Sequence, residues 1–146
     1  MATHRMTDEA DIRRRVDQWV VAIREKDLDR LMSIYAPDIV SFDIDPPLYY
    51  TGAAAKRKRW TEVLAMYQRV HDYEVRDLAI TCGDKVAFAH SLNRISGTLK
   101  SGRESGFWLR WTTCYRKVDG HWLIVHEQLS VPIDVPSGRA LLELAP

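Results

Sequence analysis

Apolar residues recur at three- and four-residue steps in the first part of the chain, and this spacing predicts an amphipathic helix. Thr7 or Asp8 is a candidate cap for its start, because a side-chain oxygen there can accept hydrogen bonds from free backbone amides. We therefore expect a helix that buries one face. The apolar stripe on that face consists of Ile12, Val16, Trp19, Val20 and Ile23.

A second, shorter helix and a short strand follow. The helix is predicted over about residues 28–36, with Asp27 as its cap and Pro37 as its stop. The pattern over residues 39–43 indicates a strand. Pro46-Pro47 ends it, because proline cannot donate a hydrogen bond to a strand ladder.

A third helix is predicted over about residues 53–70, with Trp60 on its buried face. A basic run, residues 56–59, lies near its start. A solvated helix face is the favoured interpretation of this run, and an anion site is the alternative.

From residue 73 onward the hydrophobic pattern changes period. Four segments rich in β-branched and aromatic residues are separated by short turn signals, which predicts an antiparallel meander. Helices followed by a meander define an α+β fold. One short turn is expected near residues 140–144. The four strand segments are residues 73–81, 85–97, 107–118 and 121–133, and the turns between them are Gly83-Asp84, Ser101-Gly102 and Asp119-Gly120.

Two-residue turns would fix which residues lie opposite each other, because each turn sets the register of its two strands. Side chains alternate along a strand, so counting back from the turns places four rows on one face. One face should pack on the helices, and the other should be covered by a second copy of the chain. The rows are Asp77, His90, Thr113 and His126; Val75, Leu92, Trp111 and Gln128; Ala79, Phe88, Tyr115 and Ile124; and Tyr73, Arg94, Leu109 and Ser130.

Length and charge exclude several classes of protein. The 146 residues fit one domain, 1–146, and the net charge of +1 argues against a general nucleic-acid-binding protein. No apolar run approaches the ~18 residues of a membrane helix, and the first residues lack the apolar core of a signal peptide. We expect a cytoplasmic protein without nucleic-acid or membrane partners. Reduced thiols at Cys82 and Cys114 are favoured over a disulfide.

Segments spread over nearly the whole chain carry a resemblance to a known family. They are 26–29 (KDLD), 34–38 (IYAPD), 42–48 (FDIDPPL) followed by Gly52, 90–94 (HSLNR) and 119–132 (DGHWLIVHEQLSVP). In these segments the chain resembles SnoaL-like, ketosteroid-isomerase-like members of the NTF2-like superfamily. Gln128 stands where similar proteins usually have a second histidine.

This resemblance implies an α+β cone, with a strongly curved antiparallel sheet wrapped around three N-terminal helices and a pocket between them. The concave face would carry His90 and His126, and the convex face would form a homodimer. The superfamily includes isomerases, cyclases, dehydratases, hydrolases and non-catalytic assembly domains, so fold by itself does not assign an activity.

Asp43 is the candidate general base. A carboxylate in an apolar pocket has a raised pKa, which suits proton abstraction. The alternative is a carboxylate that accepts hydrogen bonds from backbone amides before the prolines. Tyr50, Tyr73 and Tyr115 are candidate donors to a substrate oxygen.

His90 and His126 are candidates for a proton shuttle or oxyanion donor, with Asp77 behind one of them as an orienting group. The alternative is a buried hydrogen-bonded row that only stabilises the sheet. No ligand-type spacing is present, so no metal site is expected.

Aromatic side chains are candidate walls for a flat, apolar ligand, and core filling is the alternative. The hypothesis that follows is a cofactor-independent isomerase, cyclase or dehydratase that moves a proton on an apolar carbonyl compound. A non-catalytic binding module and a structural scaffold are the alternatives. The candidate substrate-binding residues are Tyr50, Trp60, Asp77, Arg94, Trp111, Thr113 and Gln128.

Overall fold

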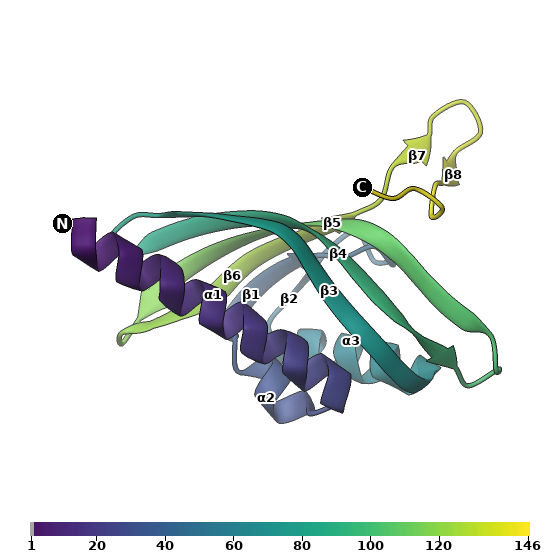
Figure 1. Cartoon of the computed structure of the whole chain (residues 1–146), viewed down its shortest axis with the longest axis horizontal. Helices are drawn as coiled ribbons and strands as arrows, with labels where there is room; N and C mark the ends of the chain where they lie inside the picture. The colour runs from purple at the N-terminus through teal and green to yellow at the C-terminus, as the bar shows by residue number, and fades with distance from the viewer. Residues whose placement is uncertain (1) are drawn as a thin grey trace.

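Three helices lie against one side of a single curved sheet in the computed structural model, which describes residues 2–146 (Figure 1). The sheet has six strands in the order β2-β1-β6-β5-β4-β3, and only β1 and β6 are parallel. The α+β class and the meander are therefore confirmed. The elements are α1 (Ala2–Glu25), α2 (Leu28–Met32), β1 (Tyr35–Phe42), β2 (Tyr50–Thr51), α3 (Ala53–Met66), β3 (Tyr67–Cys82), β4 (Val86–Leu99), β5 (Glu104–Val118), β6 (His121–Ser130), β7 (Ile133–Asp134) and β8 (Arg139–Ala140).

Helix α1 buries the predicted stripe, but its start differs from the prediction. The helix begins at residue 2, so neither Thr7 nor Asp8 caps it. Asp8 is buried instead, and its Oδ1 accepts hydrogen bonds from Lys117 Nζ at 2.8 Å and Trp122 Nε1 at 3.0 Å. This contact ties the first half of α1 to the far end of the sheet.

Helix α2 has the predicted cap and a shorter span. The Asp27 side chain accepts a hydrogen bond from the Arg30 amide at 3.1 Å. The helix ends at Met32, and β1 begins at Tyr35, which lies opposite Ile124 of β6. Pairing with a distant strand has overridden the local helical pattern here.

The predicted register between β4 and β5 is wrong by one residue. The Leu99 amide donates to the Arg103 carbonyl at 2.9 Å, which leaves three residues, 100–102, in the turn, and the Gly102 amide donates to the Leu99 carbonyl at 2.8 Å. His90 therefore lies opposite Thr112 instead of Thr113. A slip of one residue moves a strand's side chains to the other face. His90 is exposed, whereas its neighbours Ala89 and Ser91 are buried.

An irregularity in β6 inverts the second half of that strand. Tyr115 lies opposite Ile124, but Cys114 lies opposite His126, so one extra residue has entered the strand. Beyond this bulge Glu127 is buried and Gln128 is exposed. The polar row expected on the concave face is therefore absent: of its four members only Thr113 is buried.

A second irregularity falls in β3. The pairing with β4 shifts between Arg76 and Ala79, and Asp77 has a positive φ of 56°. Asp77 and Ala79 are exposed, whereas Tyr73 on the near side of the shift is buried. The prediction that Ala79 lies on the concave face, in one row with Tyr115 and Ile124, is therefore also wrong.

The core contains four of the five tryptophans, and the predictions for Trp19, Trp60 and Trp111 are confirmed. Trp19 of α1 stacks on Trp111 of β5, with ring centroids 4.6 Å apart and planes 9° apart. Trp60 and Tyr73 both meet Trp19 edge-on. Trp122 is the fourth buried tryptophan. These rings fill the space between the helices and the sheet, and Trp60 and Tyr73 also line the cavity described below.

The last part of the chain differs from the prediction. Strands β7 and β8 form a small hairpin that extends away from the sheet, where a single turn was expected (Figure 1). Both cysteines are free thiols. None of the helices described here is long and apolar enough to span a membrane.

Candidate functional site

A cavity of about 270 Å³ lies between α3 and the concave face of the sheet. Its volume is just below the range typical of drug-sized ligand pockets, so it suits a small molecule. One end carries charged side chains and the other is apolar. The charged end is lined by Asp43, Asp45, Lys56 and Arg59, and the remaining lining residues are Ile44, Trp60, Val63, Met66, Tyr67, Tyr73, Ile95, Phe107, Leu109 and Leu129.

Asp43 follows directly after β1 and is held at the charged end mainly by side chains. Its Oδ1 accepts a hydrogen bond from the Ile44 amide at 2.8 Å. Its Oδ2 accepts one from the Tyr50 hydroxyl at 2.8 Å and lies 3.4 Å from Lys56 Nζ. Only one carboxylate oxygen is therefore occupied by a backbone amide, so the amide-capping interpretation of Asp43 accounts for one of its three contacts.

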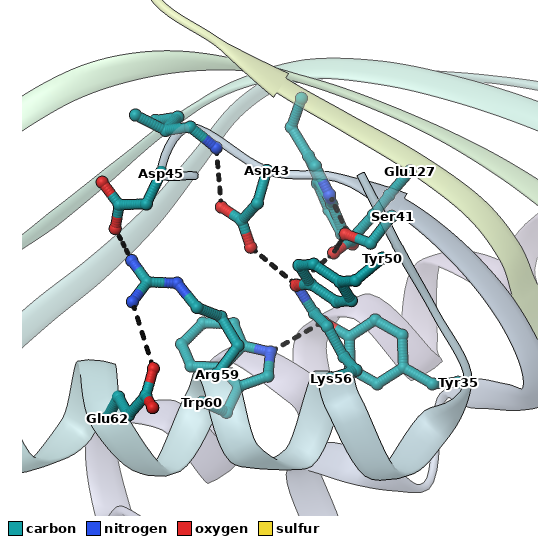
Figure 2. Close-up of polar contacts among 12 residues, drawn as sticks. Tyr35, Ser41, Asp43, Asp45, Tyr50, Lys56, Arg59, Trp60, Glu62 and Glu127 are labelled. Atoms are coloured by element: carbon teal, nitrogen blue, oxygen red, sulfur yellow. Dashed lines mark hydrogen bonds and ion pairs between the residues drawn. The ribbon is translucent and has the colours of Figure 1, made fainter. Parts of the chain in front are cut away.

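Lys56 and Glu127 form a buried ion pair beside Asp43 (Figure 2). Their side chains are 3% and 1% exposed. Glu127 also accepts hydrogen bonds from Ser41 Oγ and from Trp111 Nε1, each at 3.2 Å. Both of its oxygens are thus satisfied, as a buried carboxylate requires.

The charges at this end of the cavity stabilise one another. Burial alone would raise the pKa of Asp43, but the Lys56 ammonium, the Tyr50 hydroxyl and the Ile44 amide bring it below its ordinary value. Burial alone would lower the pKa of Lys56, but Glu127 and its neighbours raise it well above the ordinary value. Asp43 and Lys56 are therefore both ionised at neutral pH. The expected rise in the Asp43 pKa does not occur, because Lys56 lies beside it.

Tyrosine hydroxyls complete the polar end. Burial raises the pKa of Tyr50 to about 12, so Tyr50 is a neutral donor at neutral pH. Tyr35 lies deeper, and its hydroxyl accepts hydrogen bonds from Trp19 Nε1 at 3.1 Å and Trp60 Nε1 at 3.0 Å. The Lys56 ammonium lies 5.4 Å from the centre of the Tyr35 ring. This ring adds a cation–π contact to the buried ion pair.

Arg59 crosses the space between α3 and the loop that carries Asp43 and Asp45 (Figure 2). Its guanidinium forms an ion pair with Asp45 and lies 3.7 Å from Glu62 Oε2. The Arg59 side chain is 21% exposed, whereas Asp45 and Glu62 are about half exposed. Arg59 therefore lines the cavity, and the two more exposed carboxylates, Asp45 and Glu62, hold its guanidinium in place.

Some predicted site residues come together at the cavity. Asp43 and Trp60 line it, Tyr50 bonds to Asp43, and Trp111 reaches the polar end through Glu127. Thr113 is buried, but its hydroxyl donates to the Tyr115 hydroxyl at 3.1 Å and does not line the cavity.

The two histidines lie on the outer face of the sheet, which corrects their predicted place in the pocket. His90 and Asp77 line a depression there, because the β4–β5 register differs from the predicted one and β3 is irregular at Asp77. His126 Nδ1 lies 2.7 Å from the Val40 carbonyl oxygen, and its ring meets Phe42 edge-on at 4.6 Å. Neither histidine lines the cavity.

Arg94 and Gln128 also lie away from the cavity. Arg94 belongs to the outward-facing set of β4 and approaches Gly106 of β5. Gln128 is exposed as a result of the β6 bulge. Neither side chain can contact a ligand in the cavity.

Sequence reasoning missed Lys56, Arg59 and Glu127. Lys56 and Arg59 belong to the basic run at the start of α3, where positions 56, 59, 60 and 63 share one helix face. A solvated face was therefore the wrong interpretation for Lys56 and Arg59, whereas Arg57 of the same run is exposed. Glu127 is inward only because of a bulge. Among residues 2–146 no cluster of three metal-ligating side chains occurs.

The helices, the curved sheet and the cavity between them define an α+β cone. The chain belongs to the SnoaL-like domain family, within the NTF2-like superfamily, and the family model matches residues 12–134. A search of curated proteins finds no match.

Solved structures of similar shape agree with this family. An NTF2-like protein of unknown function from Pseudomonas putida KT2440 is 30% identical, with 97% of this chain and 98% of that chain covered and a TM-score of 0.87. A hexachlorocyclohexane dehydrochlorinase (LinA) type 2 is 17% identical, with 89% and 88% covered and a TM-score of 0.78. An NTF2-like superfamily protein from Salmonella enterica serovar Typhimurium is 15% identical, with 93% and 99% covered and a TM-score of 0.79. The last two similarities concern the fold alone.

Proposed function

We propose that this protein is a cofactor-independent enzyme that moves a proton on a small, largely apolar carbonyl compound, with Asp43 as the base. The observation that carries this proposal is that Asp43 lines an apolar cavity with an oxygen held by side chains, Tyr50 and Lys56, and not by backbone amides. A carboxylate so placed can exchange its side-chain partners for a substrate proton.

The low pKa of Asp43 determines which proton it can remove. Asp43 stays ionised at neutral pH but is a weak base, so the substrate must carry an acidified C–H bond. A C–H bond next to a carbonyl group meets this need. Its electron pair forms a C=C bond as the carbonyl π pair moves to oxygen, and the proton passes to Asp43. The protonated carboxyl then returns the proton to the same carbon or to another.

The apolar end of the cavity supports an apolar substrate body. Trp60, Phe107 and Leu129 are among the side chains that would surround it. A hexachlorocyclohexane dehydrochlorinase is among the proteins of similar fold, and it is an enzyme named for a small apolar ring. The alternative is a non-catalytic module that holds a ligand of the same shape, with Asp43 serving only as a hydrogen-bond acceptor.

Hydrogen–deuterium exchange distinguishes the two. Acetophenone has nine non-hydrogen atoms and exchangeable methyl protons beside its carbonyl, and NMR in D₂O follows their loss. We expect the protein to accelerate this exchange and Asp43→Asn to lower the rate by roughly 10²- to 10⁴-fold. Asp38→Asn, the same change at an exposed carboxylate, is the matched control. Acetophenone binding without accelerated exchange would favour the binding module.

A homodimer through the convex face of the sheet remains part of the proposal. Val86 and Phe88 are 63% and 52% exposed there, which is high for large apolar side chains on a sheet. A second copy would remove them from water. The dimer would support the curved sheet from outside, while the ligand occupies the inside.

A further inference from the structure

One donor in the cavity wall has no partner. Arg59 Nε is buried and, within residues 2–146, makes no hydrogen bond. Buried polar groups are nearly always hydrogen-bonded, and a charged donor left alone costs more than a neutral one. The unpaired Arg59 N–H is therefore available to donate a hydrogen bond to a ligand in the cavity.

The rest of the Arg59 side chain is fixed. One terminal nitrogen pairs with Asp45 and the other lies 3.7 Å from Glu62. These two carboxylates hold the outer edge of the guanidinium in place, and Nε is its buried donor without a partner. Arg15 Nε is also unpaired, but Arg15 does not line the cavity.

Arg59 and Asp43 belong to the same end of the cavity but to different elements. Arg59 lies on α3, one turn after Lys56, and Asp43 lies on the loop after β1. The Arg59 charge is near enough to help lower the pKa of Asp43. A ligand at this end would therefore meet an acceptor on one side and a donor on the other.

We propose that Arg59 Nε donates a hydrogen bond to the carbonyl oxygen of the substrate and thereby selects compounds with an acceptor oxygen next to the carbon that loses its proton. This inference rests on the proposed function, because it assigns the group that faces the developing enolate oxygen. As the C–H electron pair moves toward oxygen, the N–H···O bond strengthens. No proton leaves Arg59, because its guanidinium stays charged throughout.

The proposal also restricts the charge of the substrate. In the cavity lining Asp43 and Asp45 balance Lys56 and Arg59, and the buried Glu127 behind Lys56 adds one negative charge to this end. An additional carboxylate on the ligand would meet this negative excess in a region of low dielectric, where like charges repel strongly. The substrate class is therefore a neutral carbonyl compound, with its apolar body toward the far end of the cavity.

A matched pair of probes tests Arg59 separately from the chemistry. Acetophenone and α-methylstyrene have the same shape and differ only in a carbonyl oxygen against a methylene group. If Arg59 Nε binds the oxygen, the wild-type protein should bind acetophenone roughly 10- to 100-fold more tightly than α-methylstyrene. Arg59→Lys keeps the positive charge but removes Nε. It should bring the ratio of the two affinities, acetophenone to α-methylstyrene, close to one.

Arg57→Lys is the matched control, since Arg57 lies on the same helix with an exposed side chain and does not line the cavity. Its ratio should equal that of the wild type. Thermal unfolding of each variant verifies that it is folded, and α-methylstyrene binding reports on an intact cavity in Arg59→Lys. A folded Arg59→Lys that keeps the wild-type ratio overturns the inference, as does a wild-type ratio near one.

The outcomes also separate this inference from the proposed function. In one outcome, Arg59→Lys loses the preference for acetophenone over α-methylstyrene, but the wild type does not accelerate hydrogen–deuterium exchange. The role of Arg59 in binding the carbonyl oxygen would then stand, and the proposed proton transfer would be overturned. In another outcome, the exchange depends on Asp43 but the affinity ratio is the same in the wild type and in Arg59→Lys. The proposed proton transfer would then stand, and the role of Arg59 would be overturned. Failure of acetophenone to bind the wild type at all would overturn both.

Discussion

Lys56 of α3 and Glu127 of β6 form an ion pair in the interior, 71 positions apart in sequence, and neither side chain is more than 3% exposed. The pair joins the helix that forms one wall of the cavity to the sheet that forms the other. Removing water from two charges is costly, and the cost is recovered only with good hydrogen bonds. Ser41 and Trp111 supply these to Glu127, and Tyr50 and Asp43 lie beside Lys56.

Breaking this pair from either side should destabilise the protein. Lys56→Met or Glu127→Gln leaves one buried charge without its main partner, which typically costs about 3–5 kcal/mol of the free energy of unfolding. The double variant should cost less than the sum of the two, by roughly 0.5–3 kcal/mol, because the second change removes the stranded charge. Urea unfolding measures all three variants.

Arg57→Met is the control for this cycle. Arg57 pairs with Asp29 on the surface, where both side chains are largely exposed. Such exposed pairs contribute about 0–1 kcal/mol, so this variant should change little. Strict additivity of Lys56→Met and Glu127→Gln would mean that the two charges do not act on each other.

The charge on Asp43 should stabilise the fold except in acid. Its folded-state pKa is lowered, chiefly because Lys56 and Tyr50 outweigh the opposing effect of burial. The contribution of a carboxylate with a lowered pKa is present above its unfolded pKa, about 3.9, and is lost as the pH falls through the lower folded value. The wild type should therefore be more stable than Asp43→Asn by a constant amount above about pH 5, and the difference should shrink below about pH 4.

Urea unfolding of both proteins across this range measures that difference. Asp38→Asn should show no comparable change, since Asp38 is 70% exposed. A wild-type advantage that grows as the pH falls would mean that the folded-state pKa of Asp43 is raised and that the ion pair with Lys56 is not formed in solution.

The order of elements was readable from the sequence because it depends on local patterns. The α1 stripe, the Asp27 cap and the four strands of the meander follow from periodicity, capping chemistry and turn residues. Trp19 and Trp111 were both expected inside, and they stack there. These features need no knowledge of how distant segments pair.

The site was not readable, because it depends on register. One extra residue in the β4–β5 loop moves His90 to the outer face, and one bulge in β6 exchanges His126 for Glu127 on the inside. Bulges carry no reliable sequence signature, and each inverts the face of every later position in its strand. Asp43 and Tyr50 escaped this error because they lie on a loop and on the two-residue strand β2, outside the meander.

Asp8 should anchor α1 to the sheet. Its carboxylate accepts from Lys117 and from the buried Trp122 Nε1, so Asp8→Ala leaves the indole N–H without its partner. A buried donor without a partner costs about 1–3 kcal/mol. Urea unfolding should show a loss of this size, and hydrogen exchange should quicken in the first half of α1. Asp17→Ala, an exposed change on the same helix, is the control.

The homodimer proposal predicts a specific effect at Phe88. This side chain is 52% exposed on the outer face, in a depression with Val86 and Val125. Light scattering should give about twice the 16.9 kDa of one chain for the wild type. Phe88→Glu should shift the mass toward one chain, because a carboxylate at the centre of an apolar interface loses its water without gaining a partner.

Leu48→Glu is the control for that experiment. Leu48 is 90% exposed on the loop after Asp43, away from the depression, so its charge should leave the mass unchanged. A wild type that stays at the mass of one chain at high concentration would contradict the dimer. A Phe88→Glu protein that stays dimeric would instead mean that the two copies meet elsewhere. In that case the outer face, including His90, would be open to solvent in the assembly.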